Sequence, residues 1–338
     1  MRQYHSGSDA YGHIAVAGAG AWGTALAVVA ARAGRKVTLW AREPGVVASI
    51  RSRRRNEIFL PGAELPAAVV ATGDLAETAS ADAILLGVPA QHLRKVLAQL
   101  APLLGRPKPL VVCAKGIERG TGKLMTEVLG EFARAEDVAI LSGPAFARDV
   151  TNNLPTAVTI AASDILVAQR LQVSLSHAGF RPYASDDVTG VALGGAAKNV
   201  YAIACGIVAG MGLGESARAA LLARSFAELR RFGEALGAKS ETLMGLSGLG
   251  DLVLTATSPT SRNYAFGVEV GKGRSRADLD ARGHPLAEGV ETAPALVARA
   301  AHHGVELPIA ETTAAILDGS LALNDAIVQL MMRPLKTE

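Results

Sequence analysis

Aromatic residues and cysteines are scarce in this chain of 338 residues, and its positive and negative charges nearly balance. Aromatic side chains make up only 4% of the sequence, whereas 36 residues are glycine and 49% are hydrophobic. This aliphatic, glycine-rich composition is typical of a parallel sheet with tight turns between strands and helices, and it disfavours a β-sandwich. The length and the apolar content are sufficient for two domains, each with its own core.

The chain has only two cysteines, Cys113 and Cys205, and both lie within apolar stretches. Neither has the spacing of a metal-ligand pair, so no metal cofactor is predicted. We expect both to be reduced, buried thiols, which is typical of a cytoplasmic protein.

The net charge is only +3 at pH 7, and the sequence has no basic stripe with aromatic residues interleaved. A nucleic-acid partner is therefore not predicted. A modest positive excess is compatible with an anionic small molecule as the binding partner but does not by itself indicate one. The oligomeric state stays open at this stage, with a homodimer as one alternative.

Two apolar stretches resemble membrane or export segments by composition. The stretch 14–31 is interrupted by glycines, and no basic segment precedes it. The stretch 191–213 is long enough to cross a bilayer, but Lys198 and Asn199 lie near its centre. We therefore predict no membrane span and a cytoplasmic location.

The order of apolar and polar segments predicts two domains of different class. Residues 1–12 are polar without a pattern and predict a disordered tail. Alternating strand and helix patterns over 13–185 predict a doubly wound α/β dinucleotide-binding domain, and helical patterns over 186–338 predict a helical substrate domain. The expected strands are 13–17, 36–41, 83–88, 110–114, 138–141 and 157–161, with the first helix at 22–33.

The glycines at 18, 20 and 23 form a G-x-G-x-x-G motif between the first strand and the first helix. Gly18 would allow the tight turn, Gly20 the close approach of a pyrophosphate, and Gly23 the packing of helix against sheet. We call residues 18–23 the glycine loop. The motif predicts dinucleotide binding at the helix N-terminus, with Ala21 and Trp22 of the loop among the contacts.

The end of the second strand normally distinguishes the two nicotinamide cofactors. Arg42 occupies this position, and an arginine there accommodates a 2′-phosphate, so NADP(H) is favoured. Glu43 follows directly, and an acid can bind the ribose 2′-hydroxyl, so NAD(H) stays an alternative.

Lys198 is the only charged residue in the apolar stretch 191–213. An ammonium group in an apolar core needs a partner or a chemical role, because burying it alone is costly. In a helix its side chain would extend back over Gly194 and Gly195. The sequence therefore predicts a ligand on bare backbone beneath the amine, with the two glycines as the floor of the substrate pocket.

Four further clusters carry groups suited to binding or chemistry. Lys115 follows an apolar strand, the turn 141–147 contains Gly143, and Asp251 lies between glycines and leucines. The trio Ser261, Arg262 and Asn263 offers a hydroxyl, a guanidinium and an amide together, which suits a phosphate. Each cluster taken singly is equally consistent with a helix cap or an ordinary turn.

In this order, the motifs resemble the bacterial NAD(P)-dependent glycerol-3-phosphate dehydrogenases over residues 13–320. The motifs that carry the resemblance are GAGAWGTALA, KG at 115–116, SGPAFA, LGGAAKNVYAIA, GLGDLVLTATSPTSRN and AEG at 287–289. The resemblance implies a Rossmann domain followed by a helical domain. It also implies the interconversion of glycerol 3-phosphate and dihydroxyacetone phosphate, which supplies the backbone of phospholipids.

The resemblance also implies roles for individual residues. Lys198 is implied to accept the proton of the C2 hydroxyl, with Lys115 and Asp251 beside it in a catalytic group. The implied substrate contacts are Lys115, Gly143, Ala145, Lys198, Asp251, Ser261, Arg262 and Asn263. The implied cofactor contacts outside the glycine loop are Arg42, Lys115, Ala147, Arg262, Leu286 and Glu288.

Two positions depart from the family pattern. Ala145 replaces the usual serine or threonine, and Ser216 replaces an asparagine. Neither change removes a catalytic group. Two other hypotheses stay open: a β-hydroxyacid or ketopantoate-type NADP reductase, and a nucleotide sensor without catalytic activity. The phosphate-type trio disfavours the first, and the buried acid and lysine disfavour the second.

Overall fold

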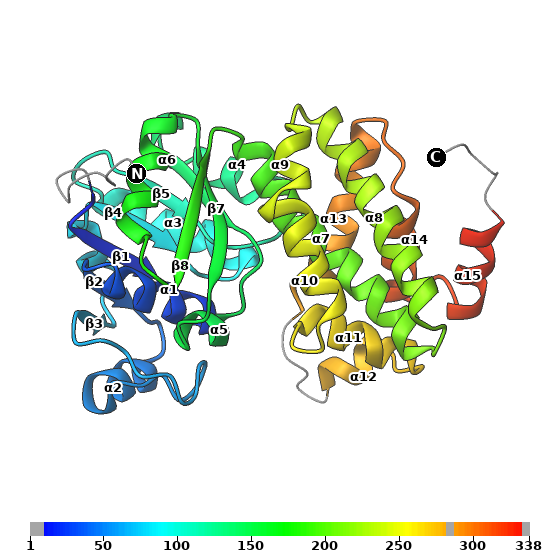
Figure 1. Cartoon of the computed structure of the whole chain (residues 1–338), viewed down its shortest axis with the longest axis horizontal. Coiled ribbons are helices and arrows are strands. Elements are labelled where there is room, and N and C mark those ends of the chain that lie inside the picture. Colours follow the sequence, from blue (N-terminus) through cyan, green and yellow to red (C-terminus); the bar gives the residue numbers. More distant parts are fainter. Residues whose placement is uncertain (1–9, 282–286, 333–338) are drawn as a thin grey trace. The chain divides into compact units, whose positions relative to one another are not determined.

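The computed structural model describes residues 10–281 and 287–332, and the chain divides into two compact units. The N-terminal unit comprises residues 1–114 and 125–192, and the C-terminal unit comprises 115–124 and 193–338. Figure 1 shows strands and helices in the first unit and helices in the second. The short segment 115–124 therefore leaves the sheet directly after a strand and belongs to the helical unit.

The N-terminal unit is built on an eight-stranded sheet with the order β3-β2-β1-β4-β5-β6-β7-β8. All neighbouring strands are parallel except β6 and β7, which are antiparallel. The predicted Rossmann-type, mostly parallel fold is thereby confirmed. The strands are β1 (His13–Ala17), β2 (Lys36–Trp40), β3 (Val69–Thr72), β4 (Ala83–Leu86), β5 (Leu110–Val112), β6 (Val138–Ser142), β7 (Thr156–Ala162) and β8 (Phe180–Ser185).

Helices connect most of these strands and pack against the sheet (Figure 1). They are α1 (Ala21–Arg32), α2 (Pro44–Arg53), α3 (Leu93–Leu100), α4 (Met125–Gly130), α5 (Ala147–Thr151) and α6 (Ile165–Leu175). In β1 the residues from Ile14 onward have no exposed area, because helices cover both faces of a parallel sheet. The strand order reverses between β1 and β4, and ligands bind at the carboxyl ends of strands at such a point.

Strands β3 and β8, at the two edges of the sheet, were not predicted from the sequence. β3 has four residues, and Val70 in it is half-exposed. β8 alternates buried and exposed positions and contains Pro182, a residue that sheets tolerate at an edge. β8 lacks the continuous apolar run that marks a central strand, and β3 has only four residues, so their sequences carry a weaker signal.

The prediction of a disordered tail over residues 1–12 is wrong at Tyr11; residues 1–9 lie outside the described part of the chain. Tyr11 is buried, and its backbone N–H donates to the hydroxyl of Ser174 at 2.8 Å. The guanidinium of Arg170 lies 4.1 Å from the centre of the tyrosine ring. Stacking on α6 thus orders a residue whose sequence neighbours have no pattern.

In the C-terminal unit, the described residues form helices and turns. The helices are α7 (Val188–Gly210), α8 (Glu215–Ala235), α9 (Ser240–Met244), α10 (Asp251–Thr257), α11 (Arg262–Gly271), α12 (Arg276–Ala281), α13 (Glu288–His302), α14 (Pro308–Asp318) and α15 (Leu323–Met331). A π-helical turn, Leu246–Gly250, precedes α10. Helix α7 begins with residues of the N-terminal unit and continues into this one.

Helix α7 is long and apolar enough to cross a membrane. However, 94% of its most apolar stretch is buried within the protein. Glycines bring it close to α11. A Cβ on Gly206 would lie 2.2 Å from the carbonyl oxygen of Tyr264, and one on Gly267 would lie 2.2 Å from that of Ile203. The glycine-rich, apolar sequence of α7 is therefore explained by helix packing in a core.

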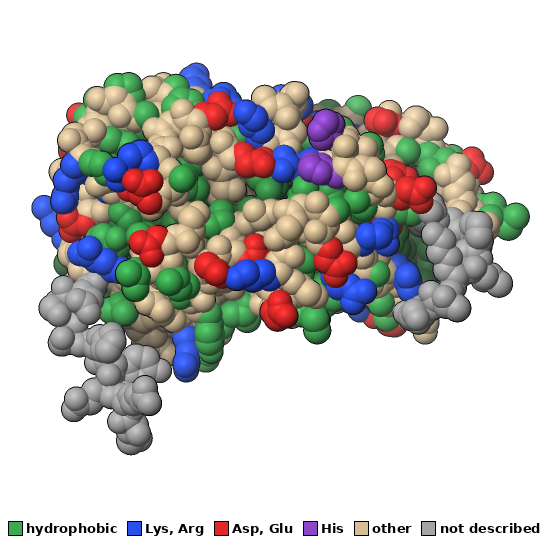
Figure 2. Space-filling model, turned by 90° about the horizontal axis from the view of Figure 1, so that it is seen from above, with side chains coloured by type: hydrophobic (Ala, Val, Ile, Leu, Met, Phe, Trp, Pro, Cys, Tyr) green, Lys and Arg blue, Asp and Glu red, His purple; other side chains and the backbone are tan. Residues whose placement is uncertain are grey.

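Charged side chains of both signs are interspersed on the face drawn in Figure 2. This agrees with the small net charge of +3. Opposite charges frequently pair at short range, as with Arg94 and Glu131. Exposed pairs of this kind contribute little to stability.

Candidate functional site

The glycine loop follows β1 directly and leads into α1 (Figure 1). Gly18 has φ of +116°, and a Cβ there would lie 2.9 Å from the backbone nitrogen of Val88. A Cβ on Gly23 would lie 1.8 Å from the carbonyl oxygen of Gly18. Both positions therefore require glycine, as the motif predicted.

Gly20 serves a different purpose in the same loop. A Cβ at this position would meet no atom within 4 Å, so its backbone faces open space. Gly20 caps α1, but no side chain caps the helix and its first turn has no acidic residue. Free backbone N–H groups at a helix N-terminus attract an anion. These features fit a dinucleotide pyrophosphate, and Ala21 and Trp22 form the first residues of the helix beside it.

Arg42 follows β2 at the same edge of the sheet. Its side chain is 76% exposed, and its guanidinium pairs with Glu43 at 2.7 Å. The structure thus places an arginine and an acid together at the position that distinguishes the cofactors. The preference for NADP(H) through Arg42, with NAD(H) through Glu43 as the alternative, stays a prediction.

A second set of functional groups lies in the C-terminal unit, where Lys115, Lys198 and Asp251 form a lysine–aspartate cluster. Lys198 Nζ lies 2.8 Å from Asp251 Oδ1, and Lys115 Nζ lies 2.6 Å from Asp251 Oδ2. Lys198 also donates to the hydroxyl of Thr255 at 2.7 Å. The aspartate side chain is 1% exposed and the Lys198 side chain 9% exposed, so both charges are removed from water.

Burial and neighbouring charges shift the pKa values of this cluster. Burial lowers the pKa of Lys198 from 10.5 to about 8; Asp251 acts in the opposite direction, and Lys115 adds to the lowering. Burial alone would raise the pKa of Asp251, but the two ammonium groups outweigh burial and lower it. Asp251 is thus a stable anion, while Lys198 can gain or lose a proton near neutral pH.

The turn before α10 places Asp251 against α7. A Cβ on Gly194 would lie 2.6 Å from the carbonyl oxygen of Ser247, and one on Gly248 would lie 1.9 Å from that of Leu243. These two glycines let the π-helical turn approach both its own preceding helix and α7. The prediction that Gly194 forms the floor of a substrate pocket is therefore wrong, because protein backbone occupies the space beside it.

Two asparagines connect the cluster to neighbouring helices. The amide of Asn199 donates to the carbonyl of Lys115 at 2.8 Å, and the amide of Asn263 donates to Asn199 Oδ1 at 2.9 Å. Asn263 Oδ1 in turn accepts from the backbone N–H of Gly289 at 2.9 Å. Asn199 and Thr255 were not predicted from the sequence as members of the site. An amide next to Lys198 and a hydroxyl one helical turn after Asp251 were the available signals.

Only Arg262 of the predicted phosphate trio is exposed. Ser261 is 3% exposed and caps α11 by accepting from the N–H of Tyr264 at 3.2 Å. Asn263 is 8% exposed and takes part in the asparagine chain. The trio therefore combines an exposed cation, Arg262, with two buried polar groups that hydrogen-bond within the protein at the N-terminus of α11.

The remaining predicted residues belong to element ends. Gly143 and Ala145 lie between β6 and α5, and Ala147 begins α5. Gly143 has φ of +145°, and a Cβ there would lie 2.8 Å from Val158 Cα. Glu288 begins α13, and its charge slightly opposes the lowering of the Lys198 pKa. Leu286 lies outside the described residues, and Ser216 lies in the first turn of α8.

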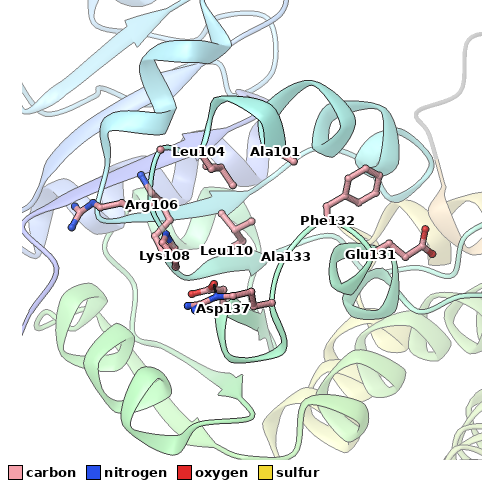
Figure 3. A pocket seen from close by; sticks show the side chains of 12 residues that line it. Ala101, Leu104, Arg106, Lys108, Leu110, Glu131, Phe132, Ala133 and Asp137 are labelled. Atoms are coloured by element: carbon pink, nitrogen blue, oxygen red, sulfur yellow. Dashed lines mark hydrogen bonds and ion pairs between the residues drawn. The ribbon is translucent and has the colours of Figure 1, made fainter.

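A cavity of about 430 Å³ lies at a different place in the N-terminal unit (Figure 3). Its lining includes Lys108 before β5 and Asp137 before β6. It therefore lies at the amino ends of these strands, whereas the glycine loop lies at the carboxyl end of β1. Lys108 Nζ donates to the carbonyl of Ala81 at 2.8 Å, so this buried cation is bound to the protein itself. Among the described residues, no group of three or more His, Cys, Asp or Glu side chains could hold a metal ion.

Comparison with known proteins gives consistent matches over almost the whole chain. The family models for the N- and C-terminal parts of NAD-dependent glycerol-3-phosphate dehydrogenase match residues 13–168 and 187–328. A glycerol-3-phosphate dehydrogenase (NAD(P)+) of Parvibaculum lavamentivorans is 54% identical over 329 residues, which are 97% of this chain and 99% of that protein. One from a Bradyrhizobium species is 57% identical over 325 residues, or 96% of this chain and 98% of that protein.

Solved structures agree with the sequence matches. The crystal structure of glycerol-3-phosphate dehydrogenase from Coxiella burnetii has a TM-score of 0.90 and 36% identity, and the match covers 96% of this chain and 100% of that one. A ketopantoate reductase from Ralstonia eutropha has a TM-score of 0.59 and 18% identity, with 93% of this chain and 99% of that one covered. The second likeness shows a shared fold alone.

Proposed function

The chain belongs to the NAD(P)-dependent glycerol-3-phosphate dehydrogenases, and we propose that it interconverts sn-glycerol 3-phosphate and dihydroxyacetone phosphate by hydride transfer. The observation that carries the proposal is the burial of Lys198 beside Asp251, because burial lowers the pKa of this lysine to about 8 while the carboxylate holds the amine in place. The residues of the glycine loop would hold a nicotinamide dinucleotide, which would supply the hydride chemistry at C2 in either direction. The glycine loop and the uncapped N-terminus of α1 fit the pyrophosphate of that cofactor.

In this mechanism Lys198 is the general acid and base. During oxidation its neutral amine takes the proton of the C2 hydroxyl as the C2–H bond breaks, and the hydroxyl becomes a ketone. During reduction its ammonium form gives that proton to the developing alkoxide. A pKa of about 8 allows both forms to exist near neutral pH.

Asp251 and Lys115 support this step. Asp251 accepts from Lys198 at 2.8 Å and so fixes the direction of the amine, while its lowered pKa keeps it ionised. Lys115 shares the same carboxylate through its other oxygen and adds a second positive charge. We assign to Lys115 both a substrate contact and electrostatic stabilisation of the alkoxide.

We assign the phosphate of the substrate to Arg262, together with Asn263 and Ser261, because the guanidinium is exposed and lies on the first turn of α11. We assign further substrate contacts to Gly143 and Ala145. Ala145 has no hydroxyl, so a hydrogen bond that serine or threonine would supply to the substrate is either lost or supplied by water.

For the cofactor we propose a preference for NADP(H) over NAD(H), through Arg42 and the 2′-phosphate. Glu43 accepts from the same guanidinium and opposes this preference. The further cofactor contacts that we propose are Lys115, Ala147, Arg262, Leu286 and Glu288. In the cell, we propose a cytoplasmic enzyme, with a homodimer as its assembly, that supplies glycerol 3-phosphate for phospholipid synthesis.

Steady-state kinetics with dihydroxyacetone phosphate and each reduced cofactor tests the proposal. We expect turnover of dihydroxyacetone phosphate with NADPH and with NADH, and a higher kcat/KM with NADPH. Ketoacids such as ketopantoate serve as the comparison substrates. Turnover of ketoacids alone would identify a β-hydroxyacid-type reductase, and cofactor binding without turnover of either class would identify a nucleotide sensor.

A further inference from the structure

Asn56 is a fully buried polar residue outside both sets of functional groups described above. It lies in the segment between α2 and β3, and its exposed fraction is 0%. A buried amide is costly unless its donors and acceptor are all satisfied. The partners of Asn56 therefore indicate why an amide is present at this point.

The side chain of Asn56 reaches the glycine loop with its nitrogen. Nδ2 donates to the carbonyl oxygen of Ala19 at 2.7 Å and to the hydroxyl of Thr24 at 2.8 Å. The Thr24 hydroxyl itself donates to the same Ala19 carbonyl at 3.3 Å. Oδ1 accepts from the backbone N–H of Phe59 at 3.2 Å. The two N–H bonds of the amide are thus directed at the glycine loop and the first turn of α1.

The bond to Ala19 has a consequence for the neighbouring peptide group. In a trans peptide the C=O of one residue and the N–H of the next point in opposite directions, and the described residues contain no cis peptide bond. Because Asn56 and Thr24 draw the Ala19 carbonyl inward, the N–H of Gly20 points away from them. A Cβ on Gly20 would meet no atom within 4 Å, so there is also open space beside its Cα.

We propose that Asn56 is a positioning residue for cofactor binding, which holds the peptide between Ala19 and Gly20 so that its N–H is presented to the pyrophosphate. This inference rests on the proposed function, because it presumes that the glycine loop binds a dinucleotide. Asn56 acts through the loop and makes no contact with the cofactor itself. Thr24, also 0% exposed, is the second member of this support.

The variant Asn56→Asp tests the donor role with little change in size. An aspartate can still accept from Phe59, but its carboxylate cannot donate to Ala19 or Thr24. It also adds a negative charge behind the loop. At about pH 8.5 we expect the dissociation constant of NADPH to rise about tenfold or more, with kcat at saturating NADPH within about twofold of wild type.

Protonation of the new carboxyl group provides a rescue. Burial raises the pKa of a carboxylic acid, and the protonated form again has a donor for Ala19. The ratio of the variant's dissociation constant to that of wild type should therefore fall towards one as the pH is lowered to about 6. A purely structural role predicts no such recovery of NADPH affinity.

Ser174→Ala is the matched control. Ser174 is also 0% exposed and lies in the same unit, and its hydroxyl accepts from Tyr11 and donates to the carbonyl of Arg170. Removing it should lower Tm while the affinity for NADPH stays at the wild-type value. The melting temperatures of both variants, measured on the full chain, show how far each one is destabilised.

The outcomes separate this inference from the proposed function. Tight NADPH binding by wild type with weak, pH-rescued binding by Asn56→Asp supports the inference. An Asn56→Asp variant that binds like wild type at pH 8.5 overturns it, as does an equal loss of affinity in Ser174→Ala. A wild-type protein that binds neither NADPH nor NADH overturns the proposed function, and this inference with it.

Discussion

The glycine loop consists of six consecutive residues, whereas the lysine–aspartate cluster joins side chains that are 53 and 136 residues apart in the chain. The loop is shaped by backbone: a Cβ at Gly18 or Gly23 would collide with main-chain atoms. The cluster is shaped by charge: two ammonium groups share one buried carboxylate. A motif in one short segment is sufficient to form the glycine loop, but the lysine–aspartate cluster forms only when the C-terminal unit folds.

This difference means that substitutions should separate cofactor binding from chemistry. Changes at the glycine loop should act on the affinity for the dinucleotide. Changes at the lysine–aspartate cluster should act on kcat while the cofactor still binds.

Lys198→Met should have the largest effect. It keeps the apolar stem but removes the group that gains and loses the proton, so kcat should fall by about 10²–10⁴-fold. NADPH affinity, measured by fluorescence titration, should stay near the wild-type value. Near-normal turnover would show that Lys198 is structural. A loss of NADPH affinity as large as the loss of kcat would show that cofactor binding and catalysis are not separable at this residue.

The pH dependence should have opposite signs in the two directions of reaction. Oxidation of glycerol 3-phosphate needs the neutral amine, so kcat/KM should rise about tenfold per pH unit and level off above the Lys198 pKa of about 8. Reduction of dihydroxyacetone phosphate needs the ammonium form, so kcat/KM should be level below that pH and fall above it. Profiles that bend in the same sense in both directions would contradict a single acid–base lysine.

Gly194→Ala should disturb the cluster without touching its charges. The added Cβ would lie 2.6 Å from the Ser247 carbonyl, so the turn before Asp251 must move and the contact with Lys198 should weaken. We expect kcat to fall about tenfold, with NADPH affinity unchanged. Gly130→Ala is the matched control, because a Cβ there meets no atom within 4 Å. Equal kcat values in the two variants would show that Gly194 does not set the position of Asp251.

Arg42→Ala should have the smallest effect and should act on the cofactor alone. Its side chain is largely exposed, so we expect the dissociation constant of NADPH to rise about three- to tenfold and that of NADH to change less. Titration with both cofactors provides its own control, since they differ only in the 2′-phosphate. Equal losses for NADPH and NADH would exclude a 2′-phosphate contact.

Much of the fold could be predicted because its signals are local. Central strands such as β1 and β4 are continuous apolar runs, and the three glycines mark the turn between β1 and α1. The edge strand β8 was missed because buried and exposed positions alternate and its apolar run is broken, and β3 was missed because it has only four residues. Tyr11 was predicted to lie in a disordered tail because its hydrogen-bond partner Ser174, on α6, is 163 residues away in the chain.

The candidate site was predictable only in part, for the same reason. Lys198 stands out as a charge in an apolar stretch, and Asp251 as an acid among glycines and leucines. Asn199 and Thr255 did not stand out, because an amide or a hydroxyl in a helix has many ordinary roles. Gly194 was noticed but misinterpreted: the space beside it is filled by the backbone of Ser247, which a sequence cannot show.

The sequence by itself determined the glycine loop, the class of each domain and the presence of a buried lysine that needs a partner. These features depend on residue type and on spacing within one segment, where steric limits and burial costs act directly. The tertiary structure alone decided that Asp251 lies between Lys115 and Lys198, that Asn56 supports the glycine loop, and that Gly194 serves packing. Such contacts join residues far apart in the chain, and their energies exist only when folding removes them from water.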